Sequence, residues 1–167
     1  IDQGLYAIEE GFDKILIERN KKRNGPIFSV KEEWLDKLSK DSSKNLLFQT
    51  YNKKYWLSER NKAITYEANS YLRKFLKGNI EVNEIFDLEK WSWFMAVTDL
   101  NYYAHGSLFK SVKFFYNPLA GKFEPIPFDG HRLVVDLKKE IFNGADYRNS
   151  MPTFMLALEC KKNINSC

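Results

Sequence analysis

The chain has 167 residues, of which 44% are hydrophobic and 16% aromatic, so it can bury a core of ordinary size and is not disordered throughout. Its net charge of +4 is compatible with phosphate ligands but too small to argue for nucleic-acid binding. Cys160 and Cys167 lie together at the end and the only histidines are His105 and His131, which excludes a disulfide framework and a multi-histidine metal site. No apolar run approaches the roughly 20 residues of a membrane span.

The first part of the chain predicts two short strands around a helix. Residues 4–10 alternate and are rich in strand formers, and Phe12, Ile15 and Leu16 then recur at helical spacing, with Gly25 as the expected stop. Residues 26–30 predict a second extended piece. Ser29 is expected to cap a short helix over residues 31–38, and residues 39–45 predict a polar loop.

Two longer helices are predicted in the middle of the chain. Residues 59–77 place an apolar stripe on one face, made of Ile64, Ala68, Tyr71, Leu72 and Phe75. A more apolar helix follows Asp87, its expected N-cap. Its stripe predicts a buried helix with core aromatic residues, and comprises Trp91, Phe94, Met95, Thr98 and Tyr102, widened by Trp93 and Val97.

The next segments predict a β-hairpin that ends in a carboxylate. Residues 111–116 and 122–128 read as strands on either side of the turn sequence NPLAG. Pro125 and Pro127 cannot donate ladder hydrogen bonds, so the second strand should lie at a sheet edge or leave the sheet. Asp129 then presents a carboxylate, and Gly130 lets the backbone turn away from it. A last helix is predicted around Met155.

The order of these elements is typical of kinase-type phosphoryl transfer. Such enzymes have a buried helix, a catalytic loop, a hairpin and a metal-binding Asp at the end of a strand. Here the loop holds His105 and Gly106, and the strand-end residue is Asp129. The hairpin would bring two metal-binding positions together that are far apart in the sequence.

The amino-acid sequences of these segments resemble those of the CotH kinase family, which is named for a spore-coat protein. The resemblance covers residues 4–131 in separate blocks. The blocks are GLYAIEEGFDK, RNGPIF, FDLEKWSWFMAVTDLNYYAHG and FFYNPLAGKFEPIPFDGH. The last of them, which contains the hairpin, is the most specific. It implies an α+β, protein-kinase-like fold, with a hinge strand and helix in residues 1–30 and a mainly helical C-lobe carrying the hairpin in residues 31–167. The N-lobe, with its glycine-rich loop and phosphate-anchoring Lys, is expected upstream of Ile1.

The resemblance also implies an activity and its residues. Family members are kinases that bind ATP and Mg²⁺ and phosphorylate Ser residues of protein substrates. Asp129 falls on the metal-binding Asp, and Tyr6 and Glu10 fall on the strand that would contact the nucleotide. Ser111 stands where the family has an Asn as its second metal ligand, and Ser is the weaker ligand. The catalytic Asp is not evident, which leaves His105 and Asp99 as the catalytic candidates.

Structural interpretations stand beside these functional ones. Asp129 could cap a turn, His105 could bond to backbone, Asp99 could pair with a basic side chain, and Glu10 could stabilise a helix N-terminus.

For the whole chain, the departures at Ser111 and His105 favour an alternative, a catalytically impaired pseudokinase that serves as a coat or surface scaffold. An unrelated secreted α+β domain is the third interpretation. The family favours an extracellular or cell-surface location, and without an N-lobe this chain alone is expected to be inactive.

Overall fold

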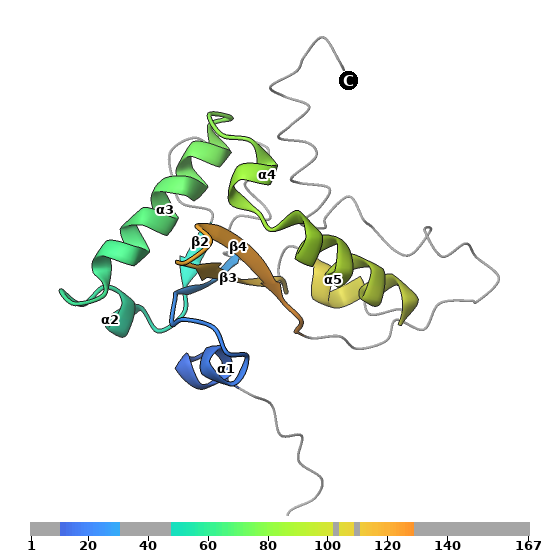
Figure 1. The fold of residues 1–167 in the computed structure, drawn as a ribbon, viewed down its shortest axis with the longest axis horizontal. Helices are drawn as coiled ribbons and strands as arrows, with labels where there is room; N and C mark the ends of the chain where they lie inside the picture. The colour runs from blue at the N-terminus through green and yellow to red at the C-terminus, as the bar shows by residue number, and fades with distance from the viewer. Residues whose placement is uncertain (1–10, 31–47, 102–103, 109–110, 129–167) are drawn as a thin grey trace, which may run out of the picture.

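The computed structural model describes residues 11–30, 48–101, 104–108 and 111–128 (Figure 1). Within these ranges the chain is a mixture of helices and one antiparallel sheet, which confirms the expected α+β class. In chain order the elements are α1 (Lys14–Arg19), β1 (Ile27–Val30), β2 (Phe48–Thr50), α2 (Lys53–Trp56), α3 (Lys62–Leu76), α4 (Val82–Ile85), α5 (Leu88–Leu100), the 3₁₀ helix η2 (Ala104–Ser107), β3 (Lys113–Asn117) and β4 (Lys122–Ile126).

The sheet has four strands in the order β2-β1-β3-β4, each antiparallel to its neighbour. The predicted hairpin is confirmed as β3 and β4, with Phe114 opposite Pro125 and Lys113 opposite Ile126. β4 lies at the edge of this sheet, as its prolines predicted. β1 lies in the middle, so the strand that follows α1 is held between β2 and a hairpin much further along the chain.

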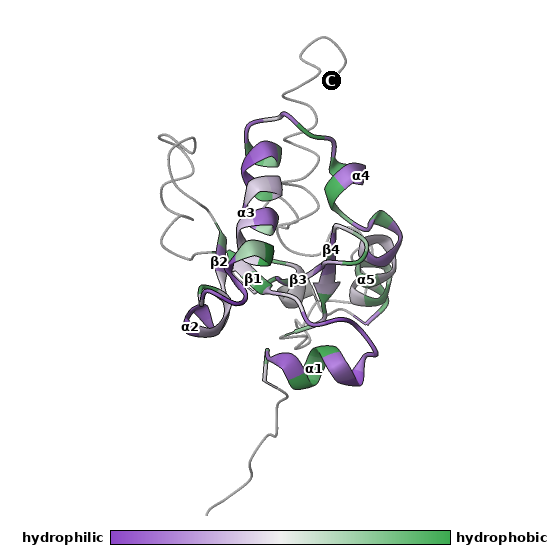
Figure 2. Ribbon diagram, turned by 60° about the vertical axis from the view of Figure 1, so that its left-hand side comes forward, coloured by the Kyte–Doolittle hydropathy of each residue, from purple (hydrophilic) through white to green (hydrophobic). Residues whose placement is uncertain are grey.

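The two faces of the sheet are covered unequally. One face packs against α3, α4 and α5, and its buried strand residues are Phe28, Val30, Phe48, Phe114, Tyr116 and Phe123. The other face carries a smaller cluster, in which Ile27, Phe115 and Ile126 pack against Ile17 of α1. Figures 1 and 2 show α1 on the side of the sheet away from α3 and α4.

The two long helices follow the sequence pattern with one exception. α3 buries Ala68, Leu72 and Phe75, as its periodicity predicted, and also Thr65, while Ile64 and Tyr71 of the predicted stripe are partly buried. α5 begins after Asp87, whose carboxylate accepts a hydrogen bond from the Lys90 N–H at 3.2 Å, as expected of an N-cap.

The predicted width of the buried stripe on α5 is wrong. Trp91 is 3% exposed, whereas Trp93 is 67% and Val97 51% exposed. Two residues along a helix correspond to a rotation of about 200°, so Trp93 cannot face the same side as Trp91.

Gly25 allows the chain to enter the sheet. A Cβ atom at this position would lie 2.2 Å from the Tyr116 carbonyl oxygen and 2.9 Å from the Phe115 ring. This close approach lets the Tyr116 N–H donate to the Pro26 oxygen at 2.9 Å. α1 has already ended at Arg19, so the expected role of Gly25 as the helix stop is wrong, and its role is to permit strand contact.

Several short elements were not predicted, namely β2, α2 and α4. Ser29, the expected helix cap, lies inside β1 opposite Gln49 and Lys113. The strand at residues 4–10, the helix at 31–38, the loop at 39–45 and the helix around Met155 lie outside the described residues.

Candidate functional site at the end of the hairpin

The hairpin brings Ser111, one of the sequence-predicted positions, and Phe128 to one end of the sheet. Its turn is closed by a hydrogen bond from the Gly121 N–H to the Asn117 oxygen at 2.9 Å, with Gly121 at a φ of 65°. At the opposite end Lys113 pairs with Ile126, so the chain just before β3 and the chain just after β4 leave the sheet side by side. Ser111 lies in the first of these and Phe128, which precedes Asp129, in the second.

The structure describes only part of the predicted residue set. Ser111 is buried, at 4% exposed, and takes part in polar contacts. Asp99 lies in the last turn of α5 and His105 in η2, two elements that contact each other, but the side chains of both residues lie outside what is described. Tyr6, Glu10 and Asp129 fall outside the described residues. The roles assigned to these six residues therefore stay predictions.

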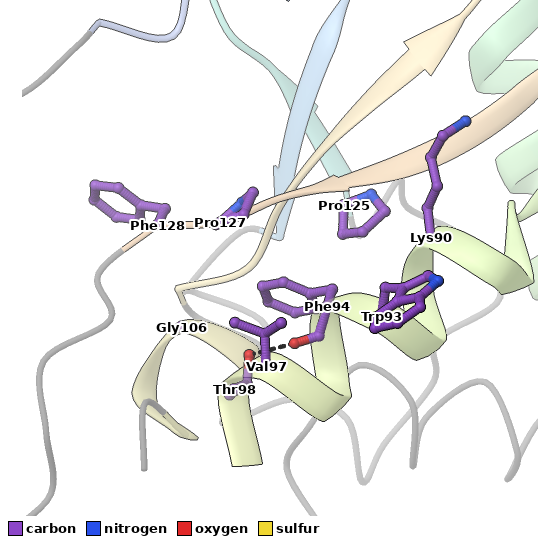
Figure 3. Close-up of a pocket in the computed structure, with 9 residues that line it drawn as sticks. All are labelled: Lys90, Trp93, Phe94, Val97, Thr98, Gly106, Pro125, Pro127 and Phe128. Carbon is purple, nitrogen blue, oxygen red and sulfur yellow. Dashed lines mark hydrogen bonds between the residues drawn. The ribbon is translucent and has the colours of Figure 1, made fainter. Parts of the chain in front are cut away.

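A cavity of about 330 Å³ lies next to the hairpin end, between α5, η2 and β4 (Figure 3). Its walls are mostly apolar and comprise Trp93, Phe94, Val97, Pro125, Pro127 and Phe128. Figure 3 shows Pro125 of β4 on the side of the strand that faces the helix, with Lys90 near one end of the cavity and Phe128 at the other.

Two further lining residues add little polarity to the wall of this cavity. The Thr98 hydroxyl lines it but donates to the Phe94 oxygen at 2.7 Å, so it is already satisfied. Gly106 is buried and adds no side chain to the wall. The cavity therefore suits an apolar or aromatic group, and its volume is at the small end of ligand pockets.

α5 is fixed to β4 by hydrogen bonds at its first turn. The Phe123 oxygen accepts from the indole Nε1 of Trp91 at 3.1 Å and from the Asp87 N–H at 3.0 Å. The Phe86 backbone also forms a bridge with Phe123. These bonds set the distance between the helix and the strand, and with it the width of the cavity.

A buried lysine lies on the other side of the hairpin end. Lys113 is 7% exposed, and its ammonium nitrogen lies 5.0 Å from the ring centroid of Phe128 and 5.9 Å from that of Tyr51. The Phe128 ring in turn meets Phe12 edge-on at 4.8 Å. Aromatic faces stabilise a cation in this position. Sequence reasoning missed Lys113, although a lysine at the start of the run KFFY was the available signal.

A buried carboxylate holds three segments together near the cavity. Glu124 is fully buried; its carboxylate accepts from Lys22, from Lys90 at 3.0 Å and from Asn117 at 2.8 Å. Lys90 also bonds to Asp87 at 2.6 Å. This set, called here the Glu124 cluster, comprises Lys22, Asp87, Lys90, Asn117 and Glu124. Sequence reasoning missed it, although a Glu inside an apolar strand was a signal.

The pKa values in the Glu124 cluster follow from these contacts. Burial pushes the pKa of Glu124 upward, but hydrogen bonds from Lys22, Asn117 and Lys90 outweigh it and leave the pKa below its usual value. Burial likewise raises the pKa of Asp87, and its bonds from Lys90 bring the net shift downward. The bond to Asp87 raises the pKa of Lys90. Glu124 and Asp87 are therefore carboxylates at neutral pH, and Lys90 is an ammonium.

The described residues do not form a metal centre by themselves. Along the described ranges, no group of three His, Cys, Asp or Glu side chains is placed to hold a metal ion. Ser111 supplies one neutral, buried oxygen at most. In the same ranges, no helix combines the length and apolar character needed to cross a bilayer.

Comparison with known protein families, curated proteins and solved structures finds no match to this chain.

Proposed function

We propose that the chain is a relative of the CotH kinase family with a kinase-like arrangement of its helices and hairpin. Its function would be ATP- and Mg²⁺-dependent phosphorylation of Ser residues in a protein substrate. The observation that supports this most is the hairpin, whose register takes Ser111 and Phe128, the residue before Asp129 in the sequence, to the same end of the sheet. An apolar cavity adjoins that end. Phosphoryl transfer requires a carboxylate that binds Mg²⁺ next to the nucleotide site, and the proposal assigns that role to Asp129.

In this proposal each predicted residue has a distinct role. Asp129 binds the metal, and Tyr6 and Glu10 contact the nucleotide. His105 or Asp99 accepts the proton of the substrate Ser hydroxyl as its oxygen bonds to the γ-phosphorus and ADP leaves. The described residues alone do not supply the metal site, so the proposal depends on Asp129.

The test is Mg²⁺-dependent nucleotide binding, measured by thermal shift on the full-length protein and on its Asp129→Ala variant. With ATP at about 100 times its Kd, binding should raise Tm by about 5–10 °C when Mg²⁺ is present. The rise should disappear in Asp129→Ala and without Mg²⁺. Glu89→Gln, at an exposed acid of α5, is the matched control and should keep the full rise. No shift in the unmutated protein, or an equal shift in Asp129→Ala, would contradict the proposal.

The second candidate is a pseudokinase scaffold, and the burial of Ser111 favours it. A Ser that is 4% exposed is a poorer metal ligand than an open Asn would be, so transfer chemistry would be weakened even if nucleotide binds. Mass spectrometry after incubation with ATP, Mg²⁺ and candidate protein substrates separates the two. Nucleotide binding with phosphoserine formation supports the kinase, and nucleotide binding without any transfer supports the scaffold.

A further inference from the structure

The outer edge of β2 carries backbone groups that point away from the sheet. The Tyr51 N–H donates to the Ile27 oxygen at 2.8 Å, and Gln49 lies opposite Ser29. Because bonding alternates along an antiparallel strand, Gln49 and Tyr51 face β1, so the N–H and C=O of Thr50 face outward. Among the described strands β2 is the end strand, and none of them pairs with this edge.

A cavity of about 480 Å³ lies along this edge, between β2, α2 and α3. The α3 side is formed by Tyr66, Asn69, Ser70 and Arg73, whose spacing places them on one face of the helix. The strand side includes Thr50, and α2 contributes Lys53. We call this feature the β2 groove. A strand edge beside a helix, with space between them, has the shape that an extended peptide fills.

The β2 groove is positively charged. Lys53 and Arg73 line it and carry positive charge. The described residues that line it include no Asp or Glu. Within the described ranges neither cation forms an ion pair.

The acids of this region are engaged elsewhere. Glu67 accepts from the Tyr116 hydroxyl at 2.9 Å, and Glu59 pairs with Lys62 at 2.6 Å. Residues 53–77 hold seven Lys or Arg against two Glu, so their excess of five exceeds the +4 of the whole chain. This part of the chain is therefore net positive, and Lys53 and Arg73 are the cations in it that line the groove.

We propose that the β2 groove binds an extended, acidic segment of a partner protein. The segment adds to the edge of β2 through backbone hydrogen bonds, and its carboxylates face Lys53 and Arg73. Asn69 and Ser70 offer further hydrogen bonds, and the exposed ring of Tyr66 supplies apolar contact. Strand addition provides the affinity in such complexes and the side-chain contacts provide the specificity. This site is independent of nucleotide binding and of the proposed kinase function.

The first test uses fluorescence anisotropy with a fluorescein-labelled peptide of alternating Glu and Val, added to the full chain at low salt. The acidic peptide should bind, and a peptide with Gln in place of Glu should bind at least tenfold more weakly. A third peptide, N-methylated at alternate amides, should also lose binding because it cannot pair with a strand. Absence of binding by the acidic peptide, or equal binding of the methylated one, would overturn the proposal.

The second test uses two charge-matched variants. The double variant Lys53→Gln, Arg73→Gln removes both cations of the β2 groove. It should weaken binding of the acidic peptide by more than tenfold. Lys54→Gln with Lys77→Gln removes the same charge from exposed positions that do not line the groove, and should change affinity less than threefold. An equal loss of peptide affinity in both variants would indicate general charge attraction only and would overturn the proposed site.

Discussion

At the scale of single residues, Glu124 is a buried charge that joins three other segments of the chain. It is fully buried, yet it joins Lys22 after α1, Lys90 on α5 and Asn117 on β3. A buried charge is tolerated only when it is paired and hydrogen-bonded, and here its acceptor positions are used by three donors. Glu124 therefore connects both sides of the sheet through the edge strand.

Glu124→Gln should destabilise the protein. The amide keeps the shape but leaves Lys22 without its partner and weakens the bond from Lys90. Because the two lysines are partly exposed, the expected loss in unfolding free energy is about 2–3 kcal/mol, below the range for fully buried pairs. Urea denaturation measures it. The control is Glu18→Gln, which breaks an exposed pair with Lys14 and should cost less than about 0.5 kcal/mol. A loss as small as in the control would contradict the role of Glu124.

The same cluster predicts how stability depends on pH. The pKa values of Glu124 and Asp87 are lower in the folded protein than in the unfolded chain. Such groups stabilise the fold above their unfolded pKa, near 4.5 for Glu124, and this stabilisation is lost as the pH falls through the folded value. The unfolding free energies of the protein and of Glu124→Gln, measured from pH 7 to pH 3, should converge below about pH 4.5. A constant gap would contradict the assignment.

At the scale of elements, α5 shows how a helix with large apolar residues on more than one face is positioned by a few directional bonds. Its sequence alone does not choose which face is buried, because Trp91 and Trp93 are equally hydrophobic. The Phe123 oxygen selects Trp91 by accepting from its indole and from the Asp87 N–H. Trp93 is left to form the wall of the cavity beside β4.

The two tryptophans should respond differently to substitution. Trp91→Phe removes one buried hydrogen bond and should cost about 1 kcal/mol, while Trp91→Ala also opens a void and should cost about 3–5 kcal/mol. Trp93→Ala should change stability by less than about 0.5 kcal/mol. Thermal unfolding gives these values, and the emission lost in Trp93→Ala should be that of a solvent-exposed indole. A Trp93→Ala variant as unstable as Trp91→Ala would contradict the orientation of α5.

Local pattern predicted the longer elements and failed on the short ones. α3 and the hairpin carry their own signals, a helical stripe in one and a turn with flanking strands in the other. β2 has only three residues and exists because Ser29 and its neighbours in β1 pair with it. Such a strand depends on its partner, so no window of sequence around residues 48–50 could have identified it.

At the scale of the whole molecule, the sheet separates a large core from a small one. The face under α3, α4 and α5 buries most of the aromatic residues, whereas α1 contributes Ile17 to a cluster with Ile27, Phe115 and Ile126. α1 has six residues, too few for a stable isolated helix. Its attachment therefore depends on this small cluster and on Lys22.

Hydrogen exchange should follow this division. Amides of β1 and β3 that bond within the sheet should exchange only through global unfolding, and those of α1 should exchange faster through local opening. Ile17→Ala should accelerate exchange in α1 by at least tenfold and leave the rates in α3 within about twofold of the original. Native-state exchange followed by mass spectrometry measures both. Protection in α1 equal to that in β3 would contradict the division.

The sequence predicted the hairpin next to the candidate site, whereas the residues that surround the site were largely missed. The turn NPLAG and the two prolines predicted a hairpin at an edge, and Ser111 and Phe128 lie beyond the open end of this hairpin. The cavity wall formed by Trp93 and Val97 and the buried cation of Lys113 were not predicted, because both depend on which elements pack together. Helical and strand periodicity report which residues share a face, and they do not report what lies opposite that face.

The central position of β1 also has a consequence for biosynthesis. β1 leaves the ribosome well before the segment of β3, its neighbour in the finished sheet. Until then the apolar side chains of Ile27, Phe28 and Val30 have no lasting partner on that side. Closing so long a stretch of chain is slow, and an unpaired apolar strand invites contact with other nascent chains. The newly made polypeptide is therefore most exposed to aggregation, and most dependent on chaperones, in the interval before the hairpin emerges.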